Sequence, residues 1–157
     1  KSQVDKPLVF ELKVTQAEIA RYDAIPNNSA SLLVNQRIEE ILLEHALGDV
    51  QFFDAEVRCK DGVLTTYKMV NITHKVIGID HEKSIYTRSK TLDIIHLIKY
   101  LTYKPGCMKE HKIARDAEHL GHILVTEEIK QAFEKAKIRG PRIVRPEEYY
   151  SAMVGEI

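Results

Sequence analysis

The sequence predicts a single α+β domain with a mostly antiparallel sheet, an Asp-Gly hairpin and two or three packed helices. The chain has 157 residues and is 44% hydrophobic, so it can bury one sizeable core, whereas two separate domains would each be marginal. Residues 50–72 show the period of two that marks strands, with a hairpin signal at Asp61-Gly62. Apolar residues recur at helical spacing after Asn35 and after Thr126. We therefore expect one domain over residues 1–157.

At the N-terminus we expect a strand followed by a short helix. Apolar and polar side chains alternate over residues 8–14, as in a half-buried strand. Thr15 stands three residues before Glu18, the spacing at which a hydroxyl and a carboxylate satisfy the free N–H groups of a first helical turn. Residues 26–29 predict a loop. The start at Lys1 instead of a methionine leaves open that an N-terminal portion is missing.

A longer helix is expected after Asn35, whose side chain can cap its first turn. Ile38, Ile41 and Leu42 line one face of this helix, which should pack on the core. Gly48 is placed to end the helix in a left-handed conformation.

Strands are expected through the middle of the chain. Val50 begins an alternating segment, and Asp61-Gly62 turns it back into a return strand over residues 64–72. The apolar run 76–79 is expected to extend the same sheet.

The next segments are less regular. Residues 80–93 are polar and charged, which predicts a loop or a short helix beginning near Ser89 or Thr91. The apolar run in residues 94–103 fits either a helix or a strand, and we favour a strand. Pro105-Gly106 predicts a turn.

The last part of the chain predicts a strand–helix–strand unit. Residues 123–125 form the first strand, and Thr126 caps a helix that Gly140 closes. Residues 141–144 predict the final short strand, and we expect the tail after Tyr150 to be flexible.

The charge balance argues against nucleic-acid binding, because 23 basic residues face 23 acidic ones. The balance is uneven along the chain, however. Residues 1–56 carry ten acidic and five basic residues, and the remainder carries thirteen and eighteen. The first third therefore contains either an ordinary solvated face or an acidic patch that could meet a basic partner.

Cysteine content and hydropathy indicate the compartment. Cys59 and Cys107 are too few for a disulfide scaffold and are typical of buried thiols in a reducing compartment. No run of about eighteen apolar residues is present, so no membrane span is predicted. We expect a cytoplasmic protein, with a periplasmic location left open by the missing initiating methionine.

Catalytic motifs are absent from the sequence, including phosphate loops, dinucleotide fingerprints and nucleophile motifs. The best group of potential metal ligands lies within sixteen residues and consists of Cys107, His111, His119 and His122. Zinc sites pair close ligands at both ends, which this group does not, so surface or packing histidines are the favoured interpretation. No metal or cofactor is predicted. The alternative function is a metal- or histidine-dependent enzyme using this segment, with His119 or His122 as general base.

The order of several short segments carries the clearest functional indication. In sequence order they are Asn35 to His45, Val50 to Phe52, Tyr67 to Ile72, Ile79 to Ser84 and Ile123 to Ala132. A glycine before a short apolar stretch follows them. Together they resemble the eleventh family of immunity proteins encoded beside bacterial polymorphic toxins, over residues 26–148. The strongly charged segment 104–118 departs from the family pattern.

The resemblance implies a protein that protects by stoichiometric binding of a cognate toxin and has no catalytic residue. Such a protein needs a preorganised surface with complementary charge. If the toxin is basic, as a nuclease would be, we expect it to meet the acidic face of the helix that follows Asn35. The predicted partner-binding residues are Glu39, Glu40, Glu44 and Asp49. A scaffolding protein, which would associate with itself and need no toxin, is a third class left open.

Overall fold

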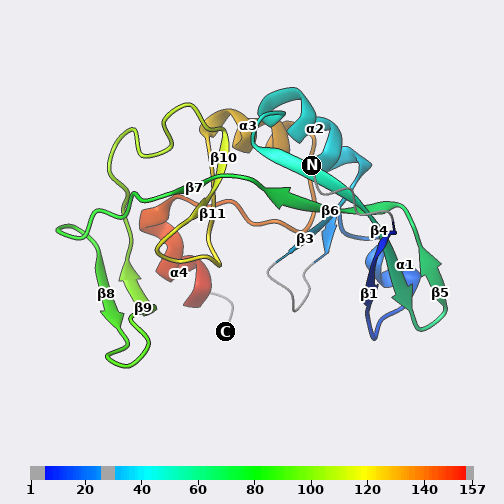
Figure 1. Ribbon diagram of the computed structural model, residues 1–157, viewed down its shortest axis with the longest axis horizontal. Coiled ribbons are helices and arrows are strands. Elements are labelled where there is room, and N and C mark those ends of the chain that lie inside the picture. The colour runs from blue at the N-terminus through cyan, green and yellow to red at the C-terminus, as the bar shows by residue number, and fades with distance from the viewer. Residues whose placement is uncertain (1–5, 26–30, 155–157) are drawn as a thin grey trace.

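The computed structural model describes residues 6–25 and 31–154, and the loop expected at residues 26–29 lies outside them (Figure 1). The described residues contain four α-helices and eleven strands, arranged in three sheets. Most strand pairs are antiparallel. The predicted α+β class with a mostly antiparallel sheet is therefore confirmed.

The main sheet has six strands and forms the body of the molecule. Its strand order is β1-β4-β6-β3-β2, with β5 paired to the far end of β4. The strands are β1 (Leu8–Glu11), β2 (Ala24–Ile25), β3 (Leu32–Asn35), β4 (Val50–Cys59), β5 (Gly62–Leu64) and β6 (Tyr67–Ile72). β1 runs parallel to β4, and the other pairs are antiparallel. The hairpin at Asp61-Gly62 is confirmed, and its return strand is divided: β5 pairs with the end of β4 and β6 with the beginning.

The helix caps predicted at Thr15 and Asn35 are both present. α1 (Gln16–Ile19) begins with the reciprocal capping box of Thr15 and Glu18. α2 (Gln36–Ala46) begins after Asn35, whose side chain accepts the N–H groups of two first-turn residues. These caps depend on residues close in sequence, which is why the sequence predicts them.

The end of α2 differs from the prediction. Gly48 does not adopt a left-handed conformation. The helix ends at Ala46, with right-handed backbone at Leu47, and the N–H of Asp49 bonds the carbonyl of Ala46. A right-handed turn leads directly into β4, so a left-handed glycine is not needed there.

Hydrophobic residues gather in three clusters. The largest joins the inner face of α2, one face of the main sheet and α3 (Glu127–Lys135), and Figure 1 shows the two helices beside each other over the sheet. The second lies around Leu33, Val57 and Tyr67, packed against Ile19 of α1. The third holds Ile79 and Ile98 and supports a separate hairpin.

A second, three-stranded sheet has the order β11-β10-β7. Its strands are β7 (Lys75–Val76), β10 (Ile113–Asp116) and β11 (Ile123–Val125). The expectation that residues 76–79 extend the main sheet is wrong. β6 pairs with β4 only as far as Val50, where β4 begins. After the N–H of Thr73 bonds the carbonyl of Asp49, the chain leaves the main sheet and pairs parallel with β10.

A third sheet is a hairpin of β8 (Ile85–Arg88) and β9 (Ile95–Tyr100). The strand predicted within residues 94–103 is confirmed. The prediction of a loop or short helix over residues 80–93 is wrong for residues 85–88, which form β8. After β8, Ser89 caps a turn by accepting the N–H groups of Thr91 and Leu92.

The C-terminal segment also differs from the prediction. Thr126 occupies the cap position of α3 without a side-chain hydrogen bond, and the backbone turns left-handed at Lys137, before Gly140. Residues 141–145 form an irregular strap, since Pro141 lacks an N–H and no ladder partner is found among the described residues. β11 and α3 thus confirm the first strand and the helix of the predicted unit, but its final strand is wrong. A 3-10 turn (Pro146–Glu148) and α4 (Tyr149–Val154) follow the strap.

Candidate functional site

Large apolar side chains lie exposed on the β8–β9 hairpin, which projects from one end of the molecule in Figure 1. Ile85 lies opposite Tyr100 and Thr87 opposite Leu97, so these side chains share the outer face of the hairpin. Leu92 and Ile94 stand in the connecting turn. We call this set the hairpin patch: Ile85, Leu92, Ile94, Leu97 and Tyr100, with exposed fractions between 39% and 67%.

The inner face of the same hairpin fixes its position. Ile95 and Ile98 are buried in the third hydrophobic cluster, with Tyr86, Tyr103 and Tyr149 packed against them. An ion pair between Arg88 and Asp93 spans the turn at 3.1 Å. The patch is therefore carried on a supported element, and several large apolar side chains exposed on one hairpin make it a candidate interaction site.

The free edges of the hairpin add a second means of contact. Among the described residues, β8 and β9 pair only with each other. An unpaired strand edge offers backbone N–H and C=O groups to an added strand of a partner. Sequence reasoning missed this surface, because an irregularity in the pairing of the two strands places Ile95 and Leu97, which are two residues apart, on opposite faces of the hairpin.

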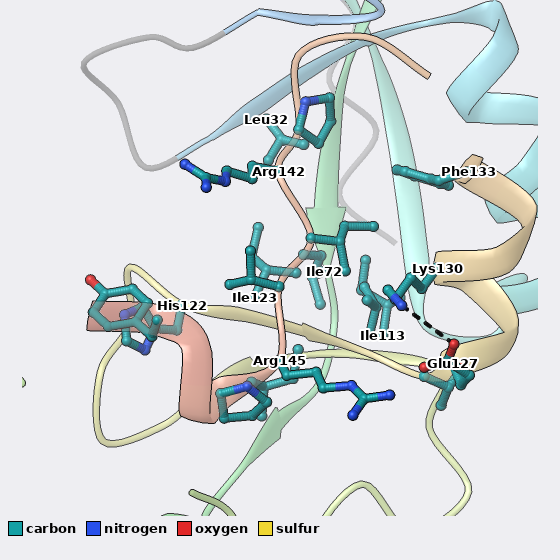
Figure 2. A pocket seen from close by; sticks show the side chains of 18 of the residues that line it. Leu32, Ile72, Ile113, His122, Ile123, Glu127, Lys130, Phe133, Arg142 and Arg145 are labelled. Atoms are coloured by element: carbon teal, nitrogen blue, oxygen red, sulfur yellow. Dashed lines mark hydrogen bonds and ion pairs between the residues drawn. The ribbon is translucent and has the colours of Figure 1, made fainter. Parts of the chain in front are cut away.

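An apolar cavity of about 480 Å³ lies between the main sheet, α3, β11 and the strap (Figure 2). Leu32, Ile72, Ile113, Ile123 and Phe133 form much of its wall. Charged groups stand at its edge: the strap contributes Arg142 and Arg145, and Lys130 pairs with Glu127 at 3.5 Å. The wall is suited to an apolar group.

The four residues singled out as potential metal ligands do not form one ligand set among the described residues. His119 and His122 stack with ring centroids 3.9 Å apart, and Tyr149 of α4 meets His122 edge-on. Cys107 packs so closely against Gly78 that a methyl group there would overlap it. His111 lies in a different group, described below.

Burial sets the ionisation of these groups. Burial lowers the pKa of His122 to about 4, with a further contribution from His119, so its imidazole is neutral at pH 7. Burial raises the pKa of the Cys107 thiol, which is therefore no activated nucleophile. Nδ1 of His119 and Nε2 of His122 are buried, and the described residues offer neither of them a hydrogen-bond partner.

His111 instead joins His74 around the carboxylate of Asp49. The Nδ1 atoms of His111 and His74 lie 2.8 Å and 3.2 Å from the same oxygen, Oδ1 of Asp49. The other oxygen accepts the backbone N–H of Lys112 at 2.7 Å. Burial alone would raise the pKa of Asp49, but the hydrogen bonds from Lys112 and His111 outweigh it and hold this pKa below its usual value.

The predicted partner-binding carboxylates are not all exposed. Glu39 bonds Lys68 of β6 at 2.6 Å, and Asp49 is 7% exposed. Glu40 and Glu44 lie on the solvent side of α2; Glu40 accepts a bond from Gln36, and the side chain of Glu44 is 75% exposed. The structure therefore brings Glu40 and Glu44 together on one surface and places Glu39 and Asp49 in internal contacts.

Within residues 6–25 and 31–154, no helix is long and apolar enough to cross a membrane. No curated protein matches the sequence of this chain. The sequence model of the Immunity protein family (Imm11) matches residues 2–143, which is most of the chain. The chain therefore belongs to the immunity protein family Imm11.

Proposed function

We propose that this protein binds a cognate bacterial toxin and neutralises it as a stoichiometric inhibitor. The observation that carries this proposal is the hairpin patch, an apolar surface held on a supported hairpin with free strand edges. A tight inhibitor needs a central apolar anchor that excludes water, and Leu97 and Tyr100 supply large side chains for one. Family membership supplies the class of partner.

The exposed carboxylates of α2 provide a second contact in this proposal. Glu40 and Glu44 are four residues apart and lie on the same side of the helix. Two neighbouring negative charges favour a toxin with a positively charged surface, as a nuclease would have. Charges at the rim of an interface act mainly by speeding association, so this contribution should weaken as salt concentration rises.

Inhibition by binding requires no catalytic group, and we propose that the protein is not an enzyme. We also propose that it acts in the cytoplasm. Both Cys59 and Cys107 are free thiols, which supports a reducing compartment.

Growth rescue tests the proposal. The protein is co-expressed with the toxin encoded by the neighbouring gene of a polymorphic toxin locus, and the wild-type chain should restore growth. Leu97→Asp places a charge in the hairpin patch and should abolish rescue. Val63→Asp is the matched control, because Val63 is a half-exposed apolar strand residue on β5, at the opposite end of the molecule from the hairpin in Figure 1.

Each outcome of this experiment is decisive. Failure of the wild-type chain to rescue growth, with both proteins expressed, contradicts toxin neutralisation. Rescue by Leu97→Asp contradicts the role of the hairpin patch. The double variant Glu40→Lys/Glu44→Lys should weaken rescue, and Glu11→Lys, at an exposed position of β1 away from the hairpin, should leave it unchanged.

A further inference from the structure

Three potential metal ligands meet where the main sheet adjoins the second sheet. Asp49 follows α2, His74 lies between β6 and β7, and His111 precedes β10. One donor atom from each residue lies within 4.8 Å of the others. Imidazole and carboxylate are the groups that hold zinc and similar ions in proteins.

The separations between the donor atoms fit a metal site. The Nδ1 atoms of His111 and His74 lie 2.8 Å and 3.2 Å from Oδ1 of Asp49. In a tetrahedral zinc site with bonds of about 2.0 Å, neighbouring donor atoms are roughly 3.3 Å apart. The donor atoms are therefore already about as far apart as in a metal site, and what remains is for the imidazole rings to turn towards one ion.

The carboxylate is already oriented for this role. Oδ2 of Asp49 accepts the N–H of Lys112 at 2.7 Å, and that of Ile113 at 3.5 Å, which leaves Oδ1 directed at the two imidazoles. Hydrogen bonds to the non-coordinating atoms of a ligand fix its orientation and are a usual part of metal sites. The side chains of Asp49 and His111 are 11% and 15% exposed, so these two ligands are largely shielded from water.

The third ligand provides the entrance. His74 is 42% exposed, and its ring stacks on that of His111 with a centroid separation of 4.0 Å and an interplanar angle of 24°. The lone pair of an imidazole lies in the ring plane, so the two rings must open from this stack to share one ion. His74 can turn because one side of it faces solvent, and the same open side admits water as a fourth ligand.

We propose that Asp49, His74 and His111 bind one divalent transition-metal ion of the zinc type. Two nitrogen donors and one oxygen donor favour Zn²⁺, Co²⁺, Ni²⁺ or Cu²⁺ over Mg²⁺ and Ca²⁺, which prefer oxygen ligands. The ion links three chain segments next to both sheets and therefore stabilises the folded protein, by an amount that grows with the logarithm of the free ion concentration above its dissociation constant. This site is independent of toxin binding.

Titration of the metal-free protein tests the site. After dialysis against a chelator, Zn²⁺ is added in a calorimeter, and Co²⁺ is added with its visible absorption recorded. One equivalent should bind, and Co²⁺ should give the intense d–d bands of a four-coordinate site without a thiolate charge-transfer band. His74→Ala should weaken binding at least tenfold. His45→Ala is the matched control, because His45 contacts the carboxylate of Glu128 at 2.9 Å without a second imidazole beside it.

The variants are chosen so that folding does not obscure the result. His74 is partly exposed, so His74→Ala should keep the native circular dichroism spectrum. Equal Zn²⁺ affinity in His74→Ala and the wild type would overturn the proposal, as would no binding at 100-fold excess of Zn²⁺ over protein. A thiolate band with Co²⁺ would assign the ion to Cys59 or Cys107 and would also overturn it.

Discussion

Arg139 donates its backbone N–H to Oδ2 of Asp23 across 2.7 Å, joining residues 116 positions apart in the sequence. The same carboxylate accepts the side-chain amide of Asn35 at 2.8 Å and the guanidinium of Arg37 at 2.9 Å. Asp23 is completely buried. The segment after α3, the cap of α2 and the start of β2 are thus held by one side chain, although the sequence does not mark Asp23 as special.

Replacement of Asp23 should strongly destabilise the protein. Asp23→Ala removes the acceptor of the Arg139 N–H and of the Asn35 amide, two part-buried donors, and the free energy of unfolding should fall by about 2 to 4 kcal/mol. Arg37 and Arg139 are half exposed and can be hydrated, which keeps the loss from being larger. Urea unfolding measures the change. Asp54→Ala, at an exposed position of β4, should cost no more than about 0.5 kcal/mol.

Asp23 should also make the stability fall in acid. Burial would raise its pKa, but the hydrogen bonds from Arg139, Asn35 and Arg37 outweigh burial and lower the pKa from 3.8 to about 2. Because the folded-state pKa is depressed, the contribution is complete above pH 4 and is lost as pH falls towards 2. The stability difference between wild type and Asp23→Asn should shrink by about 2 kcal/mol over that interval. A difference that stays constant with pH would contradict the lowered pKa.

Gly140 and Gly48 should respond oppositely to alanine. Gly140 has a φ of 115°, and an added Cβ would lie 2.6 Å from the carbonyl oxygen of Ala24. Gly140→Ala should therefore lower the free energy of unfolding by about 2 to 4 kcal/mol. Gly48 has open space and no left-handed backbone, so Gly48→Ala should be neutral or stabilise by up to about 1 kcal/mol. Denaturation of both variants in parallel checks the contrast.

Protonation of His122 should also lower the free energy of unfolding, and at a higher pH than protonation of Asp23 does. Burial lowers its pKa from 6.5 to about 4, so the unfolded chain binds a proton that the folded protein excludes between these values. Stability should therefore decrease by roughly 3 kcal/mol as pH falls from 6.5 to 4. His122→Phe keeps an aromatic ring against His119 and should remove most of this decrease. His96→Phe, at an exposed position of β9, should leave the pH profile unchanged.

The elements that the sequence predicted are those determined by neighbouring residues. Asn35 caps α2 and Asp61-Gly62 turns the β4 hairpin because each acts within a few positions. The sequence predicts the strand at Val76 in the wrong sheet. The pairing of β6 with β4 ends at Val50, where β4 begins, and the strand at Val76 pairs with β10 instead. Residues 141–144 look like a strand from their apolar character alone, but the strap has no strand to pair with among the described residues.

The same distinction holds for the functional surfaces. The four potential metal ligands are close in sequence: Cys107, His111, His119 and His122. In the folded protein, however, His111 lies against Asp49 and His74. Helical periodicity correctly put Glu40 and Glu44 on the solvent side, but it does not show that Lys68 on a strand pairs with Glu39. Exposure of the hairpin patch depends on where β8 and β9 sit relative to the third hydrophobic cluster, which no local pattern determines.

Direct measurement of the complex tests the central claim that a shaped surface of this protein inhibits a toxin. The purified chain is titrated in a calorimeter with the purified, catalytically inactivated toxin of the neighbouring gene. A one-to-one complex should form, with an affinity that falls about 30-fold or more in Leu97→Asp and is unchanged in Val63→Asp. Absence of a complex at micromolar concentrations, or equal affinities of wild type and Leu97→Asp, would contradict the central claim.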